Sequence, residues 1–132
     1  MTGVARYFMI TGVLSVLAGM IWGIQMSASG DHGLSPAHAH LNLLGWVTCA
    51  IYAVYYHVVP TASDGPVPVV HLAVTVSGLI LIVPGIVMAL TGQGETLAKL
   101  GSVLCLLSMV IFSFVVLKGA PSRVSSQAAK AS

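Results

Sequence analysis

Four long apolar runs occupy most of this chain, and none of its five basic and three acidic residues lies in the middle of a run. The runs cover residues 7–26, 37–59, 68–90 and 97–117. Each reaches the ~20 residues that a helix needs to cross a hydrocarbon core ~30 Å thick. Because a backbone in lipid must satisfy its own hydrogen bonds, we predict an all-α membrane protein with four transmembrane helices.

The composition leaves no material for a soluble domain. Of the 132 residues, 57% are hydrophobic and 6% are charged, whereas a soluble domain has about 25% charged residues. We therefore expect a single four-helix transmembrane domain over residues 1–120, surrounded by membrane lipid. A short polar tail over residues 121–132 is expected to be disordered. The formal net charge of +2 is too small to indicate a nucleic-acid partner.

The charges at the ends of the runs predict an orientation. Short connections favour an up-down-up-down bundle, in which both ends of the chain lie on the same side. That side would hold Arg6, Lys118, Arg123 and Lys130, and the other side would hold Asp31, Glu95 and Lys99. By the positive-inside rule, we expect both termini in the cytoplasm. The first run is longer than the about 7–15 apolar residues of a secretory signal, so we expect a true span. We expect the protein in a bacterial inner membrane.

Small residues mark the expected helix contacts and helix ends. A face of small residues spaced four apart on the first helix lets another helix approach closely; these are Ser15, Gly19 and Gly23. The partner helix belongs either to this chain or to another. Ser35 is expected to cap the second helix, with Pro36 at its first position. Gly119 is expected to end the last helix in the left-handed conformation.

Two histidines, His38 and His40, lie in the first turns of the second predicted helix. At ~100° per residue, side chains two apart point about 200° away from each other. Such a pair is poorly placed to chelate one metal ion and well placed to serve two separate partners. Neutral imidazole is an axial ligand of haem iron, and ionisable groups at membrane depth are candidates for function. From spacing alone, a ligand role and an interfacial role both stay open.

The other histidines and two methionines have simpler interpretations. His32 is expected to be solvated in an outer loop, whereas His57 and His71 are expected to anchor the inner interface. Met20 and Met26 fall in the same outer layer as His32 and the paired histidines. This layer offers an alternative copper(I) site, although methionines within a span are more often packing residues.

Several classes of function lack the residues that they need. No Asp or Glu lies inside a predicted span, so the buried carboxylate of a small proton-coupled exporter is missing. No nucleophile is accompanied by a base and an orienting acid. No phosphate-binding loop is present.

The second and third predicted helices resemble two helices of subunit I of the haem-copper oxidases. The Ala-His-Ala-His sequence at residues 37–40, followed by His57 and Pro60, resembles the tenth helix of that subunit. The pattern of the eleventh helix is matched by His71, Gly78, Pro84 and Gly92. The resemblance covers residues 37–94, which is less than half of the chain.

The resemblance implies a cofactor and an assembly. In the family, the first histidine of the motif binds a high-spin haem and the second binds a low-spin haem, which would assign these roles to His38 and His40. Family subunit I has three arcs of four helices, so one chain would supply one arc and a homotrimer would rebuild the ring. The second axial histidine would then come from a neighbouring copy. The adjacent histidine pair of the family's copper centre is missing, and oxygen reduction by the family mechanism is not expected.

We therefore expect a small protein that binds b-type haem and serves electron transfer or binding of a small gas, O2 or NO. If it is an enzyme, it would be a haem-dependent oxidoreductase, and a quinol is a candidate redox partner. Two alternatives stay open. One is a copper-binding or copper-handling protein that uses the outer layer of histidines and methionines. The other is a cofactor-free assembly subunit of a respiratory complex.

Overall fold

The computed structural model describes residues 1–119, and every regular element within them is helical. The elements are α1 (Gly3–Ser29), α2 (Ser35–His40), η1 (Leu41–Thr48), α3 (Cys49–Val58), η2 (Pro60–Ser63), α4 (Val67–Leu90) and α5 (Thr96–Lys118). The segments α2, η1 and α3 follow one another without a break and form one 24-residue helix, Ser35–Val58. The tail predicted over residues 121–132 lies outside the described residues.

Within residues 1–119, four helices are long and apolar enough to cross a membrane: α1, Ser35–Val58, α4 and α5. At ~1.5 Å per residue, even the shortest of them exceeds the ~30 Å hydrocarbon core. The prediction of an all-helical chain with four candidate spans is confirmed. Which end of the bundle faces the cytoplasm stays a prediction.

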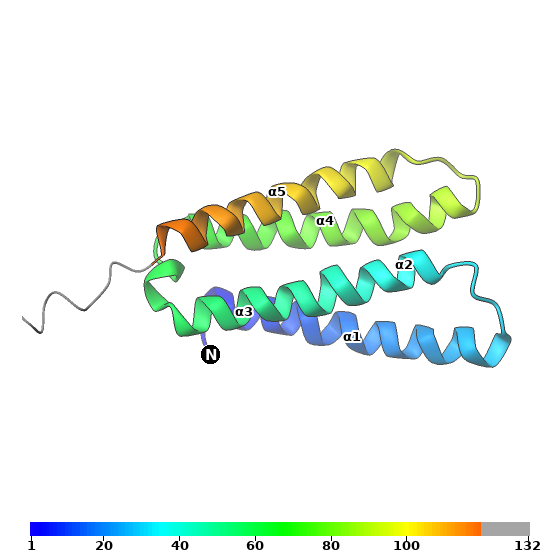
Figure 1. Cartoon of the computed structure of the whole chain (residues 1–132), viewed down its shortest axis with the longest axis horizontal. Helices are drawn as coiled ribbons and strands as arrows, with labels where there is room; N and C mark the ends of the chain where they lie inside the picture. The colour runs from blue at the N-terminus through cyan, green and yellow to red at the C-terminus, as the bar shows by residue number, and fades with distance from the viewer. Residues whose placement is uncertain (120–132) are drawn as a thin grey trace, which may run out of the picture.

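Successive helices run in opposite directions and pair as two hairpins (Figure 1). In the first hairpin α1 packs on η1 and α3, and in the second α4 packs extensively on α5. The connections at residues 30–34 and 91–95 lie at one end of the bundle, which we call the double-loop end. The N-terminus and η2 lie at the other end, which we call the N-terminal end.

Small residues let the helices of each hairpin approach closely. A Cβ atom on Gly45 of η1 would lie 2.6 Å from Ser15 of α1, and one on Gly19 would lie 2.5 Å from the Asn42 side-chain oxygen. The small-residue face of α1 therefore packs against the second helix of the same chain, which settles the question that the sequence left open. The second hairpin is equally close, because a Cβ atom on Gly101 would lie 2.5 Å from the backbone nitrogen of Ile82.

The middle of the second helix is a π-helix, which the sequence did not predict. It spans the eight residues of η1, and it places the Thr48 hydroxyl 2.9 Å from the Leu43 carbonyl oxygen five residues earlier. Gly45, in the middle of this segment, is the residue in close contact with α1. π-helical turns are rare and frequently occur near functional sites.

Two predicted helix ends are wrong by small amounts. Ser35 is the first residue of α2, so Leu34 takes the N-cap position without a side-chain capping bond, and the Ser35 hydroxyl donates a hydrogen bond of 2.7 Å to the His32 carbonyl oxygen. Gly119 is extended, with φ −66° and ψ 132°, and it sits against the Tyr55 hydroxyl. The left-handed helix end occurs instead at Gly30, with φ 69°, after α1.

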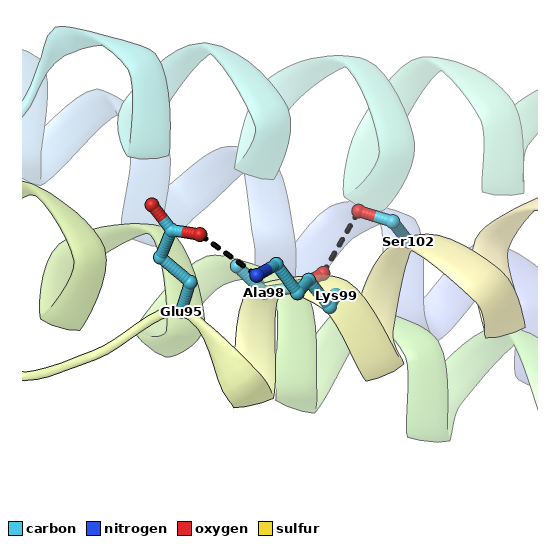
Figure 2. Close-up of polar contacts among 4 residues, drawn as sticks. All are labelled: Glu95, Ala98, Lys99 and Ser102. Atoms are coloured by element: carbon cyan, nitrogen blue, oxygen red, sulfur yellow. Dashed lines mark hydrogen bonds and ion pairs between the residues drawn. The ribbon is translucent and has the colours of Figure 1, made fainter.

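The start of α5 carries an exposed ion pair (Figure 2). The Lys99 ammonium lies 2.9 Å from the Glu95 carboxylate, and one turn later the Ser102 hydroxyl donates to the Ala98 carbonyl oxygen at 2.8 Å. The Lys99 ammonium donates a hydrogen bond to Glu95 and attracts its negative charge, so it lowers the pKa of the Glu95 carboxyl below its ordinary value of 4.5. This pair marks the surface of the double-loop end.

Candidate functional site

His38 is held between the first two helices. Its Nε2 atom lies 3.0 Å from the carbonyl oxygen of Gly19 on α1. A carbonyl oxygen only accepts hydrogen bonds, so Nε2 carries the proton and donates it. The indole of Trp22 meets the imidazole edge-on, with ring centroids 6.1 Å apart. His38 is therefore partly buried in a hydrogen bond that ties α2 to α1.

His40 makes its hydrogen bond within its own helix. Its Nδ1 atom lies 2.7 Å from the carbonyl oxygen of Pro36, one turn earlier. The same reasoning places the proton on Nδ1, which leaves the Nε2 atom of the neutral ring with a free lone pair. The side chain is partly exposed at the surface of the bundle. Histidines that bind metals usually have this arrangement, with one ring nitrogen donating to a carbonyl oxygen or carboxylate and the other binding the metal.

The remaining residues of the predicted outer layer have different surroundings. His32 is exposed in the loop, with Nδ1 3.1 Å from the Gly30 carbonyl oxygen. Met26 is 8% exposed and belongs to the core, whereas Met20 is 60% exposed on the outside of α1. Within residues 1–119, no three His, Cys, Asp or Glu side chains come close enough together to hold a metal ion.

His71 is fully buried near the N-terminal end, with 0% of its surface exposed. The expectation that it anchors the membrane interface is wrong. It lies one turn into α4, but it faces inward. The centroids of the Phe8 and Phe112 rings lie 5.0 and 5.9 Å from the centroid of the His71 ring. His57, which the sequence treated in the same way, is exposed.

Two hydroxyl groups bind the two ring nitrogens of His71. The Tyr56 hydroxyl lies 2.9 Å from Nδ1, and the Ser108 hydroxyl of α5 lies 3.2 Å from Nε2. The Ser108 hydroxyl is 2.7 Å from that of Thr75 and 3.5 Å from that of Tyr52. We call these five side chains the His71 network. It joins α3, α4 and α5, and every buried side-chain nitrogen or oxygen in the described part of the chain has a partner.

A spacing signal for this network is present in the sequence. Tyr52 and Tyr56 are four residues apart, as are His71 and Thr75, so each pair lies on one helix face. Polar groups at this spacing inside an apolar helix favour a buried contact between helices. Aromatic residues are also common near span ends, so this spacing alone does not distinguish a buried network from interfacial tyrosines.

A cavity lies beside each end of the network. A cavity of about 430 Å³ at the N-terminal end is lined by Tyr56 together with Thr2, His57 and Ser63. A smaller, mainly apolar pocket of about 30 Å³ lies beside Thr75 and Ser108; its lining also includes Leu44, Thr48, Tyr52, Leu79, Cys105 and Met109.

Comparison with protein-family models, with curated proteins and with solved structures gave no match for this chain. The assignment of a function therefore depends on the chemistry of the three partly or fully buried histidines. His38 and His40 donate to carbonyl oxygens, which fixes where each proton lies. The Thr75 hydroxyl donates to the His71 carbonyl oxygen at 2.7 Å, so the Ser108 hydroxyl donates to Thr75 and accepts from Nε2 of His71, and the Tyr56 hydroxyl donates to Nδ1.

Proposed function

We propose that this chain is a small haem-binding protein of a bacterial inner membrane, in which His40 is an axial ligand of a b-type haem. Its role would be electron transfer or the binding of O2 or NO. The observation that carries this proposal is the hydrogen bond of 2.7 Å from His40 Nδ1 to the Pro36 carbonyl oxygen. That bond leaves Nε2 unprotonated and holds the ring in one orientation, which are the two requirements for an imidazole ligand.

The surroundings of His40 favour haem over an isolated metal ion. No second His, Cys or carboxylate joins it to make a chelating group within residues 1–119. A haem iron needs only one or two protein ligands, because the macrocycle supplies four more. The partly exposed ring and the apolar helix surface around it suit a flat apolar cofactor that lies against the outside of the bundle.

One chain covers only one side of such a cofactor. We propose that a neighbouring copy covers the other side and supplies the second axial ligand, in the homotrimer that the resemblance implies. His38 is less suited to the same role, because its Nε2 atom donates to the Gly19 carbonyl oxygen and would have to give up that bond. We therefore assign the ligand role to His40 first.

A bound haem would supply a one-electron redox centre or an iron site for a gas. The chain itself contributes the orientation of the His40 ring. The Pro36 carbonyl oxygen increases the basicity of Nε2 by accepting a hydrogen bond from the N–H group at Nδ1. The apolar helices exclude water, which tunes the potential of a buried haem. A quinol is the proposed electron donor.

Haem content and oligomeric mass test the proposal in matched variants. We expect His40→Ala to lose haem and trimer together, because the cofactor would join the copies. His32→Ala removes an exposed histidine of the adjoining loop and is expected to keep both. Copper in place of haem in the wild-type protein, or a trimer that is free of haem and tolerates His40→Ala, would contradict the proposal.

A further inference from the structure

We propose that the second hairpin binds one phospholipid with an ethanolamine headgroup, at the N-terminal end of the bundle. Two adjoining hollows carry the proposal. One is a cavity of about 250 Å³, which we call the headgroup cavity, and its lining includes Thr61, Asp64, Val67, Phe114 and Lys118. The other is a groove of about 430 Å³, which we call the acyl groove, lined by Pro66, Val67, Val70, Val110, Ile111 and Phe114.

The two hollows are continuous, because Val67 of α4 and Phe114 of α5 line both of them. Their chemistry differs. Every side chain of the acyl groove is apolar, and the groove extends along α5 toward the middle of the span. The headgroup cavity adds a hydroxyl, a carboxylate and an ammonium, from Thr61, Asp64 and Lys118. A site that is charged at the end of the bundle and apolar toward its middle has the polarity of a phospholipid.

The distribution of small residues explains why this part of the hairpin is open. Close contacts between α4 and α5 occur at Gly78, Gly85 and Gly101, but no glycine occurs in residues 67–77 or 102–118. The larger side chains of Val110 and Phe114 occupy the surface there and are exposed. The chain itself therefore leaves the acyl groove uncovered, at a depth where the surrounding solvent is lipid.

The Lys118 ammonium lies at the junction of the two hollows. Its Nζ atom is 5.0 Å from the centroid of the Phe114 ring, one turn earlier on α5. Long basic side chains near span ends commonly extend toward the water, but this ammonium lies over an aromatic face, which attracts a cation. It is therefore placed to meet the phosphate of a lipid whose acyl chain occupies the groove.

The charges of the headgroup cavity select among phospholipids. Within residues 1–119, neither Asp64 nor Lys118 belongs to an ion pair, so both charges face the cavity without a protein partner. The Lys118 ammonium complements a lipid phosphate, and the Asp64 carboxylate complements a headgroup ammonium. An ethanolamine ammonium has N–H groups to donate to a carboxylate, whereas a choline group has none. A glycerol headgroup carries no positive charge for Asp64, so an anionic lipid is less well matched.

Lipid retention, measured by native mass spectrometry, tests the proposal. The full-length protein is reconstituted with equal amounts of phosphatidylethanolamine, phosphatidylglycerol and phosphatidylcholine that have the same acyl chains. It is then extracted in mild detergent, and the lipid bound to each chain is identified. We expect one phosphatidylethanolamine per chain, preferred about tenfold over either of the other lipids, or about 1.4 kcal/mol.

Two charge variants test the headgroup cavity. Lys118→Gln removes the partner of the phosphate and is expected to lower lipid retention about tenfold. Lys99→Gln removes a lysine at the other end of α5 and is expected to leave retention unchanged. Asp64→Asn removes the partner of the ethanolamine ammonium, so we expect the protein to keep a lipid but to lose its preference over phosphatidylglycerol.

A matched pair of variants tests the acyl groove. Val110→Trp fills the groove and is expected to lose the lipid, whereas Val103→Trp lies two turns earlier on α5, outside the groove, and is expected to keep it. Both positions are exposed, so the larger ring needs no space in the core. The site lies at the opposite end of the bundle from His40, and we expect the haem content to be unchanged in all of these variants.

Three results would overturn the proposal. The first is the absence of bound lipid, or equal retention of the three phospholipids, in the wild type. The second is loss of oligomeric mass in Val110→Trp with unchanged lipid, because a second copy of the chain would then fill the groove. The third is a bound quinone in place of a phospholipid.

Discussion

The Nδ1 atom of His40 lies 2.7 Å from the carbonyl oxygen of Pro36, one turn earlier in the same helix. This contact places the ring proton on Nδ1, so the free lone pair of the neutral ring is on Nε2. The side chain is partly exposed. The ring of His71 is fully buried instead, with the Tyr56 and Ser108 hydroxyl groups at its two nitrogens. The two histidines thus lie at opposite ends of the bundle, one partly exposed and bonded to a carbonyl oxygen, the other buried and bonded to two hydroxyl groups.

His38 is expected to contribute to stability and not to haem ligation. His38→Ala removes the bond to the Gly19 carbonyl oxygen, so we expect the free energy of unfolding in mixed micelles to fall by about 0.5–1.5 kcal/mol. We expect the spectrum of the haem bound at His40 to be kept. Loss of that spectrum with unchanged stability would show that His38 is the ligand.

Tyr56→Phe is expected to destabilise the bundle. It leaves Nδ1 of the buried His71 without a partner, and an unsatisfied buried polar group costs about 1–3 kcal/mol. The measurement is the free energy of unfolding, with Tyr55→Phe as the control. If both variants lose the same amount, the cost comes from removing any tyrosine hydroxyl in this region and not from the bond to His71.

Gly101→Ala is expected to disturb the second hairpin. The added Cβ atom would lie 2.5 Å from the backbone nitrogen of Ile82, and overpacking of this kind costs about 1–3 kcal/mol. The exposed neighbour Ser102→Ala is the control and is expected to change the free energy of unfolding much less. Equal stability of the two alanine variants would mean that α4 and α5 do not pack as closely as described.

The Glu95 carboxyl is expected to titrate below its ordinary value of 4.5, because the Lys99 ammonium lowers its pKa. Because the pKa is lowered in the folded chain, the ion pair adds to the free energy of unfolding above pH 4.5. This stabilisation is lost as the pH falls through the lowered pKa. Both side chains are exposed, so the effect on unfolding is expected to be small. Glu95 is the only glutamate of the chain, so ¹³C labelling of glutamate reports it alone by NMR.

Lys99→Met should return the pKa of Glu95 toward 4.5, whereas Ser102→Ala, on the same helix surface, should leave it lowered. A wild-type value at or above 4.5 would contradict the ion pair shown in Figure 2.

The spans were predictable because length and hydropathy alone set them, and the small-residue face of α1 was visible as a spacing of four. The π-helical middle of the second helix was not predictable, since Asn42, Gly45 and Thr48 within residues 41–48 do not distinguish a π-helix from an α-helix by sequence. The inward orientation of His71 also escaped prediction. Its position near a span end is typical of an anchor, and only packing against α3 and α5 turns it into the core.

The different surroundings of His38 and His40 were predicted only in part. The spacing of His38 and His40 indicated that two imidazoles would have different partners, which agrees with their separate hydrogen bonds. The carbonyl oxygens that determine the free nitrogen of each ring belong to Pro36, one turn earlier in the same helix, and to Gly19 on the neighbouring helix. That information lies in the three-dimensional structure and not in the motif.

The most direct test of the central proposal is an absorption spectrum of the purified protein, produced with ample haem and recorded oxidised and then reduced with dithionite. A sharp Soret band with resolved α and β bands on reduction, absent in His40→Ala and present in His32→Ala, is the predicted result. A spectrum without haem bands in the wild-type protein would contradict haem binding and favour the copper-binding or assembly alternatives.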